Sequence, residues 1–243
     1  KGSRWRDALG ILVGMRPCCV EANVITCNAA MSACEKCAQW QDALGLFTDM
    51  QSSRLEPSEF TYNAGICSCG KGVQWQRALG MFGDMPLQGL DQGAITYVAA
   101  ASACERCAQW QGALDILTDM AAHRLEQDAV ARHVAVSACD RATQWQGALG
   151  MFASMRRRGV DRDVKTCTTA MNACAKGALW QEALGMFADM RRRCSEPNVF
   201  TYSVAMTACG NSAQWQEALG IFADMTSYHL EPDIVTFSAA ISA

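Results

Sequence analysis

Residues 38–50 read AQWQDALGLFTDM, and close copies of this stretch return along the chain. AQWQGALDILTDM begins at Ala108, ATQWQGALGMFASM at Ala142 and AQWQEALGIFADM at Ala213. The seven tryptophans share one register, each 35 residues after the last: Trp5, Trp40, Trp75, Trp110, Trp145, Trp180 and Trp215. A strict period of this size is typical of a stacked repeat array, in which each unit buries its apolar face against its neighbours.

Each unit contains two segments with helical periodicity. In the unit that begins at Val24, the first apolar stripe follows the i, i+3, i+4, i+7 spacing of one helix face: Cys27, Ala30, Met31 and Cys34. The second stripe repeats this spacing and extends to Met50: Trp40, Ala43, Leu44 and Phe47. The turn LEPS at residues 55–58 then ends the second helix with Pro57. The sequence therefore predicts an all-α fold of helix-turn-helix repeats.

The period divides the chain into eight pieces of one array. These are a partial repeat with only a second helix (1–23), six complete repeats (24–58, 59–93, 94–128, 129–163, 164–198 and 199–233) and a partial repeat with only a first helix (234–243). We expect the array to continue beyond this fragment. Most second helices carry a central glycine: Gly10, Gly45, Gly80, Gly150, Gly185 and Gly220, with Asp115 as the exception. A glycine costs a helix about 1 kcal/mol relative to alanine, and we expect close approach of adjacent helices to compensate.

Composition excludes several function classes. No stretch approaches the roughly 18 continuous apolar residues of a membrane helix, so we predict no membrane association. The net charge of −3 gives no bulk attraction to nucleic acid, so such binding needs a local basic stripe. The three histidines, His123, His133 and His229, belong to no metal or nucleophile motif. We therefore predict a protein that is not an enzyme and that has no cofactor, metal or small-molecule substrate.

The fourteen cysteines do not predict disulfides or zinc sites. Six of them recur every 35 residues: Cys34, Cys69, Cys104, Cys139, Cys174 and Cys209. Equivalent positions on stacked helices lie about 9–10 Å apart, whereas a disulfide needs Cα atoms within about 7 Å. The CxxC pairs CEKC (residues 34–37) and CERC (residues 104–107) are two units apart, too far to share one ion. We expect small buried thiols in a reducing compartment.

Two further columns lie on the face opposite the buried stripe of the first helix. The fifth residue of each repeat is mostly short, polar and variable: Asn28, Asn63, Val98, His133, Thr168 and Ser203. The cation column contains Lys1, Lys36, Lys71, Arg106, Arg141 and Lys176, with Asn211 as the exception. A cation repeated at a fixed step suits a phosphate backbone, although a helix C-terminus also favours cations through its dipole. Together, the two columns favour a groove that binds nucleic acid.

The last residue of each repeat forms a third column: Ser58, Gly93, Asp128, Asp163, Asn198 and Asp233. All of these are good N-cap residues for the helix that follows. Helix capping alone would explain the column, so its residue types do not by themselves indicate a ligand.

Several phrases resemble the pentatricopeptide repeat family: FTYNAGICSCGKG (60–72), FTYSVAMTACGNS (200–212), ALGMFADM (183–190) and LEPD (230–233). The tetratricopeptide pattern fits less well, because Leu44 lies four residues after Trp40 instead of three and the period is 35 instead of 34. The resemblance covers essentially the whole chain. It implies a right-handed superhelical solenoid with the first helices lining its concave side.

The resemblance also implies sequence-specific binding of single-stranded RNA, about one base per repeat, read by the fifth and last residues together. The family's pairing assigns C to Asn28 with Ser58, A to Thr168 with Asn198, and G to Ser203 with Asp233. Three pairs depart from the usual combinations, and their bases stay open: Asn63 with Gly93, Val98 with Asp128, and His133 with Asp163. Of these, the pair of Asn63 favours a pyrimidine. In the family, apolar side chains of successive first helices clamp each base. Ile25, Phe60, Ile95, Val130, Phe200 and Val235 fit this role, and Lys165 does not.

The family's setting implies a mitochondrial or chloroplast protein that acts in RNA processing, stability, editing or translation. Any protein partner is expected to bind through regions that flank this fragment. The alternative function is a solenoid scaffold for protein–protein interaction. That function predicts apolar or acidic groove residues, whereas the two columns of the groove face are polar and basic.

Overall fold

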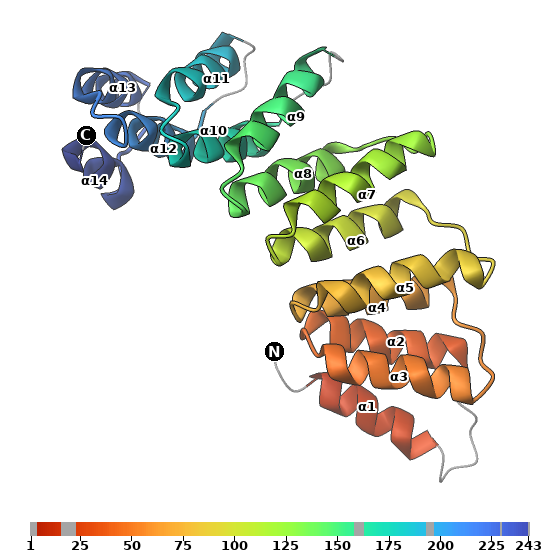
Figure 1. Ribbon diagram of the computed structural model, residues 1–243. Coiled ribbons are helices and arrows are strands. Elements are labelled where there is room, and N and C mark those ends of the chain that lie inside the picture. Colours follow the sequence, from red (N-terminus) through yellow and green to blue (C-terminus); the bar gives the residue numbers. More distant parts are fainter. Residues whose placement is uncertain (1–3, 16–22, 158–162, 193–196, 229, 243) are drawn as a thin grey trace. The chain divides into compact units, whose positions relative to one another are not determined.

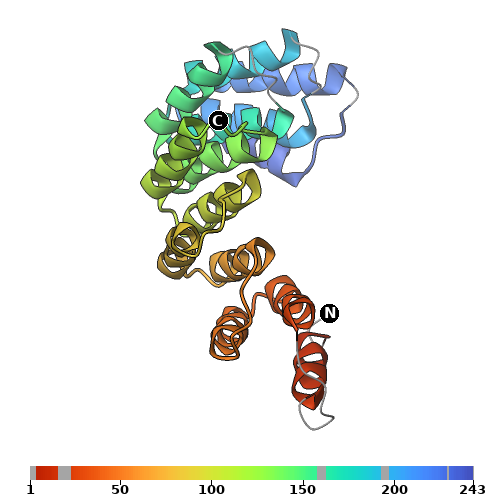
Figure 2. The ribbon, with the colours of Figure 1, turned by 90° about the vertical axis from the view of Figure 1, so that its right-hand side faces the viewer.

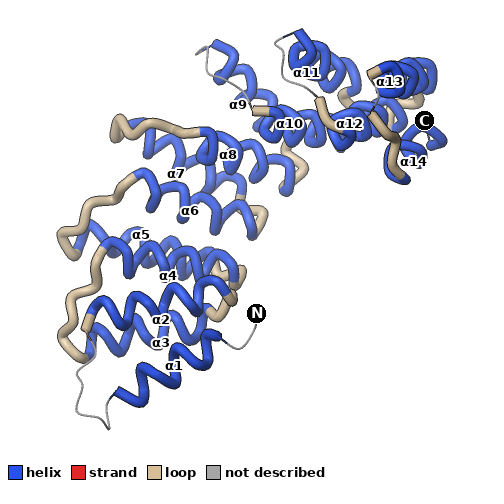
Figure 3. Tube along the Cα trace, turned by 180° about the vertical axis from the view of Figure 1, so that it is seen from behind, coloured by secondary structure: helices blue, strands red, loops and turns tan. Residues whose placement is uncertain are grey.

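The computed structural model describes residues 4–15, 23–157, 163–192, 197–228 and 230–242. These residues form fourteen helices and no strand (Figures 1 and 3). The first helices are α2 (Val24–Lys36), α4 (Glu59–Lys71), α6 (Ala94–Arg106), α8 (Ala129–Arg141), α10 (Val164–Lys176), α12 (Val199–Gly210) and α14 (Ile234–Ser242). The second helices are α1 (Arg4–Met15), α3 (Trp40–Ser52), α5 (Trp75–Leu87), α7 (Trp110–Ala122), α9 (Trp145–Arg157), α11 (Trp180–Arg192) and α13 (Trp215–Ser227). The predicted all-α solenoid of helical hairpins is confirmed.

The chain divides into two compact units, residues 1–127 and 128–243. Within the first unit, α2 packs on α4 and α4 on α6, so that consecutive first helices are neighbours. Figure 2 shows the hairpins of this unit following one another in colour order from red to yellow-green. In the second unit, α8, α10, α12 and α14 pack in the same order. In both units, each complete second helix also contacts the first helix of its own hairpin.

The hydrophobic core lies where these helices meet. All four residues of the predicted first stripe (Cys27, Ala30, Met31 and Cys34) are buried. In α3, Ala43, Phe47 and Met50 are buried as predicted, but Trp40 and Leu44 are only half-buried. An edge-to-face ring pair joins adjacent hairpins, with Phe47 and Tyr62 at 4.9 Å between centroids, and Phe187 and Tyr202 repeat it at 5.0 Å. Such pairs contribute about 0.5–1.5 kcal/mol beyond area burial.

The glycines of the second helices contradict the expected close approach. A Cβ atom at each of the six positions (Gly10, Gly45, Gly80, Gly150, Gly185 and Gly220) would meet no atom within 4 Å. These positions lie on the exposed side of the helix, which no neighbour covers, so close packing gives no compensation for the glycines. Asp115 occupies the same register in α7 and is also exposed, which explains why a side chain is tolerated there.

The turns between the two helices of a hairpin hold a left-handed residue that is never glycine. Ala38, Val73, Ala108, Thr143, Ala178 and Ala213 all have φ between 55° and 60°. Each follows a helix whose last carbonyls the turn satisfies; for example, the Gln39 amide donates to the Cys34 carbonyl at 2.9 Å. A β-branched residue such as Val73 is a backbone outlier in this region. The sequence pattern gives no sign of this conformation, because glycine is the residue that normally marks it.

The six cysteines that recur every 35 residues are fully buried, as predicted. Burial raises the pKa of each of these thiols to about 11. All cysteines in the described part of the chain are free thiols. Across the same residues, no group of three or more histidine, cysteine or acidic side chains is arranged to hold a metal ion. None of the described helices has the length and apolar character needed to span a bilayer.

Candidate nucleic-acid interface

In two repeats the fifth residue lies at the junction between successive first helices, because Asn28 contacts Thr61 and Thr168 contacts Thr201. Asn28, Asn63, Val98 and His133 are half-buried. Thr168 and Ser203 are more deeply placed than a groove face predicts, with only 3% and 2% of their surface exposed. The next first helix packs over these positions: Thr168 Oγ1 lies 3.1 Å from Thr201 Oγ1 of α12, and α14 packs on α12. Thr168 Oγ1 donates to the Val164 carbonyl at 2.7 Å, and Ser203 Oγ donates to the Phe200 carbonyl at 2.8 Å.

The last residue of each repeat caps the next first helix. The side chains of Ser58, Asp128, Asp163, Asn198 and Asp233 each accept a hydrogen bond from the backbone N–H three residues later. Gly93 has no side chain to do so. The structure thus confirms the capping role, which uses one oxygen of each carboxylate or amide and leaves its other polar atom for a ligand.

In the repeat 24–58, the structure brings the fifth and last residues together. Asn28 Nδ2 lies 3.4 Å from Ser58 Oγ, to which it donates a long hydrogen bond. Both side chains are half-buried, so they border the surface while they hold each other. Two residues 30 positions apart therefore present one combined polar edge, as reading a base by two side chains requires.

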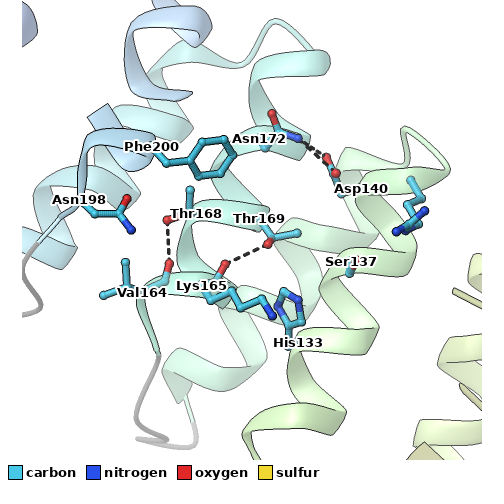
Figure 4. A pocket seen from close by; sticks show the side chains of 11 residues that line it. His133, Ser137, Asp140, Val164, Lys165, Thr168, Thr169, Asn172, Asn198 and Phe200 are labelled. Carbon is cyan, nitrogen blue, oxygen red and sulfur yellow. Dashed lines mark hydrogen bonds between the residues drawn. The ribbon is translucent and has the colours of Figure 1, made fainter. Parts of the chain in front are cut away.

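In the repeat 164–198, the equivalent pair borders a cavity within the second unit. This cavity has a volume of about 580 Å3, and Thr168 and Asn198 both line it (Figure 4). Phe200 from α12 and Lys165 from α10 complete this part of the lining, and His133 lies on the α8 side. The Asn198 amide, the Phe200 ring and the Thr168 side chain gather at one end of the cavity in Figure 4. A polar pair beside an exposed aromatic ring offers both hydrogen bonds and a stacking surface to a planar base.

The second residues of the first helices are large, apolar and exposed. In the first unit, the exposed fractions are 77% for Ile25, 56% for Phe60 and 73% for Ile95. In the second unit, Val130, Phe200 and Val235 are exposed by 55–61%. Lys165 takes this position in α10 and is also exposed. Every described first helix except α10 thus leaves an apolar surface in solvent at this position, on which a planar ligand can stack.

Lys71 and Lys176 of the cation column form ion pairs with the preceding repeat. Lys71 Nζ lies 2.8 Å from Glu35 Oε1 and donates to the Glu35 carbonyl at 3.1 Å. Lys176 Nζ lies 2.9 Å from Asp140 Oδ1 and 3.2 Å from the Asp140 carbonyl. Asn211, which replaces the cation in α12, donates to the Ala175 carbonyl in the same way. At these positions the column therefore caps the C-terminus of the preceding first helix.

The other described cations of the column, Lys36, Arg106 and Arg141, are exposed. Lys1 lies outside the described residues. The ion pairs of Lys71 and Lys176 were not predicted from the sequence. They could have been, because Glu35 and Asp140 each lie one residue before the cation position of the preceding repeat.

Comparisons with known proteins agree with this geometry. Models described as PPR repeat family, pentatricopeptide repeat domain and PPR repeat match residues 22–71, residues 151–212, and residues 60–90 and 200–230, respectively. Together these matches cover more than half of the chain. No curated protein matches the sequence.

Solved structures show the same fold. The pentatricopeptide repeat protein PPR10 from maize aligns over 98% of this chain and 34% of its own, with a TM-score of 0.76 and 23% identity. Its complex with an 18-nt psaJ RNA element aligns over 96% of this chain and 39% of its own, with a TM-score of 0.58 and 19% identity.

The PPR domain of Arabidopsis thaliana protein-only RNase P 1, in complex with tRNA, covers 70% of this chain and 90% of its own, with a TM-score of 0.61 and 15% identity. This chain thus spans about a third of the length of the maize protein. The repeat period, the hairpin fold and the family matches lead to one conclusion: this chain belongs to the pentatricopeptide repeat family.

Proposed function

We propose that this chain binds single-stranded RNA sequence-specifically and reads about one base per repeat. The observation that carries the proposal is the convergence of the fifth and last residues of a repeat beside an exposed apolar side chain. Asn28 meets Ser58 directly, and Thr168 and Asn198 line one cavity with Phe200. Structures of similar fold were solved in complex with an 18-nt RNA element and with tRNA, which supports RNA as the ligand.

The proposed roles follow the three columns. The fifth and last residues read bases: C for Asn28 with Ser58, A for Thr168 with Asn198, and G for Ser203 with Asp233. The exposed second residues sandwich the bases, and the cation column contacts the backbone. The array acts without catalysis, in processing, stability, editing or translation of RNA in a mitochondrion or chloroplast. The scaffold alternative is less favoured because the fifth residues are mostly uncharged polar side chains and the column beside them is basic.

Salt dependence tests the contact with phosphates. Each phosphate neutralised on single-stranded RNA contributes about −0.7 to the slope of log affinity against log salt. Contacts from all six cations would give about −4; because Lys71 and Lys176 are held in ion pairs, we expect a slope shallower than this. Glu35→Gln releases Lys71 and removes a negative charge, so we expect tighter binding and a slope steeper by about 0.7. Fluorescence anisotropy with a labelled single-stranded RNA pool from 50 to ~300 mM salt measures both.

Matched lysine variants serve as controls. Lys36→Gln should make the slope shallower by about 0.7, whereas Lys71→Gln should change it little because the ion pair already neutralises that ammonium. A wild-type slope near zero would remove the backbone role of the column. Equal effects of the two lysine variants would show that the Glu35 ion pair opens when RNA binds.

A further inference from the structure

The third residue of the first helices is a threonine in every repeat except one. The column consists of Thr26, Thr61, Thr96, Thr166, Thr201 and Thr236, with Ala131 as the exception. Its members are buried, apart from the half-buried Thr26. Capping explains part of this, because the Ser58 backbone N–H donates to Thr61 Oγ1 at 3.0 Å. Capping does not explain the further contacts of Thr61 and Thr201, whose hydroxyls reach the fifth residue of the preceding repeat.

The Thr61 hydroxyl touches both residues of the Asn28–Ser58 pair. Thr61 Oγ1 donates to Asn28 Oδ1 at 2.7 Å, the shortest bond in this group, and lies 3.0 Å from Ser58 Oγ. Because Asn28 Oδ1 accepts from Thr61, the Asn28 amide turns its Nδ2 donor towards Ser58 Oγ and the surface. The amide of Asn28 thus has a fixed polarity, and a residue of the next repeat fixes it.

The second unit repeats this arrangement with different residues. Thr201 Oγ1 donates to Asn198 Oδ1 at 2.9 Å and lies 3.1 Å from Thr168 Oγ1. The Thr201 backbone N–H also donates to Asn198 Oδ1 at 2.9 Å. With Oδ1 fully engaged, Asn198 has only its Nδ2 donors to offer to the cavity that it lines.

The repeat 59–93 shows that this link is not an automatic result of the fold. Its last residue is Gly93, which has no side chain for the Thr96 hydroxyl to meet. In the described part of the chain, Thr96 Oγ1 and Asn63 Oδ1 are both buried without a hydrogen-bond partner. The link therefore forms where the pair offers an amide oxygen within reach of the threonine.

We infer that Thr61 and Thr201 are positioning residues for base reading, an inference that rests on the proposed function. Each hydroxyl holds the oxygen of a reading amide inside the protein, so that the amide N–H donors face the base. On the Watson–Crick edge, C and A carry a ring nitrogen acceptor where U and G carry an N–H donor. A fixed N–H donor therefore selects C or A over U or G where the reading pair offers no carboxylate to accept the ring N–H of U or G. This agrees with the C proposed for the repeat 24–58 and the A proposed for the repeat 164–198.

Two substitutions at Thr61 test this role in the intact 243-residue chain. Thr61→Val removes the hydroxyl at nearly constant volume, and Thr61→Ser keeps it. Two RNAs are compared that differ only at the nucleotide read by the repeat 24–58, which is C in one and U in the other. The readout is the dissociation constant of the U-containing RNA divided by that of the C-containing RNA. We expect Thr61→Val to reduce this ratio about tenfold, the effect of losing one base-directed hydrogen bond of roughly 1.4 kcal/mol. We expect Thr61→Ser to keep it.

Thr166→Val is the matched control. It removes the same column hydroxyl, whose oxygen is buried without a hydrogen-bond partner in the described structure. It should leave the ratio of the two dissociation constants for the repeat 24–58 unchanged. If Thr61→Val folds, as measured by helicity, and retains the wild-type ratio, the positioning role is wrong. If Thr61→Val does not fold, Thr201→Val is tested in the same way, with two RNAs that have A or G at the nucleotide read by the repeat 164–198. Loss of base preference in the wild type itself would instead overturn the proposed function.

Discussion

Raising the pH from 8 to 10 is expected to unfold this chain. Burial raises the pKa of six thiols from the ordinary value of 9.0 to about 11. They belong to the cysteines that recur every 35 residues: Cys34, Cys69, Cys104, Cys139, Cys174 and Cys209. Since the folded pKa is raised, the stability linked to each thiol is fully present below pH 9 and is lost as the pH rises towards 11. Each thiol contributes about 1.4 kcal/mol per pH unit in that window. Each compact unit contains three of these thiols and therefore loses about 4 kcal/mol per pH unit, which is close to the lower end of the stability of a single domain, about 5 kcal/mol.

Far-UV circular dichroism during a pH titration, with a reductant present, measures this transition. We expect loss of helicity with a midpoint between about pH 9 and 10. A variant with Cys69→Ala, Cys139→Ala and Cys209→Ala loses half of the linked protons, so its transition should move to higher pH. Full helicity of the wild type at about pH 10.5 would contradict the linkage.

Replacing the six central glycines of the second helices with alanine should stabilise the array by about 3–6 kcal/mol. Each substitution removes backbone freedom from the unfolded chain and contributes about 0.5–1 kcal/mol. The added methyl groups meet no atom within 4 Å, and the sites are far enough apart for their effects to add. The measurement is the denaturant concentration at the midpoint of unfolding in urea, for the wild type and for the sixfold variant (positions 10, 45, 80, 150, 185 and 220).

Two glycines of α4 provide the opposite control. A Cβ atom at Gly65 would lie 2.3 Å from Met81 Cε, and one at Gly70 would lie 3.0 Å from the Ala103 backbone. We therefore expect Gly70→Ala to destabilise the chain, since backbone cannot move aside as a flexible side chain can. A sixfold variant less stable than the wild type would show that the second helices need their central glycines for packing.

The sequence predicts the fold well because the fold is local and repeated. Trp40 and its equivalents give the period, and the Cys27–Cys34 stripe correctly identifies the buried face of the first helix. The prediction that an adjacent helix approaches Gly45 closely was wrong, although this glycine recurs with the same period. A period shows that a position recurs, but it does not show which neighbour faces that position. The left-handed Ala38 was likewise hidden, because alanine carries no signal for that conformation.

The candidate site is only partly readable from sequence. The columns that contain Asn28 and Ser58 follow from variation among repeats, but their contact depends on how two hairpins stack. The burial of Thr168 could not be predicted, because it depends on how α12 packs over α10. The ion pair of Lys71 with Glu35 joins residues 36 positions apart, and comparing the columns of neighbouring repeats could have found it.

The central claim is that each repeat reads its own base through its fifth and last residues, and Ser58→Asp tests it most directly. Serine and aspartate are both good N-caps, so helix α4 should remain intact. By the family's pairing, Asn28 with Ser58 favours C. The same Asn28 with an aspartate at position 58 favours U, since a carboxylate accepts a hydrogen bond from the U ring N–H.

Sequences are selected from a random RNA pool by the wild-type chain and by the Ser58→Asp variant, and dissociation constants are then measured for two RNAs that differ only at the affected nucleotide. We predict a change from C to U at one position of the selected sequence, a change of about tenfold or more in the ratio of the two constants, and unchanged preferences elsewhere. If both proteins fold and select the same sequence, the two columns only cap and support the helices, and the account of base reading is wrong.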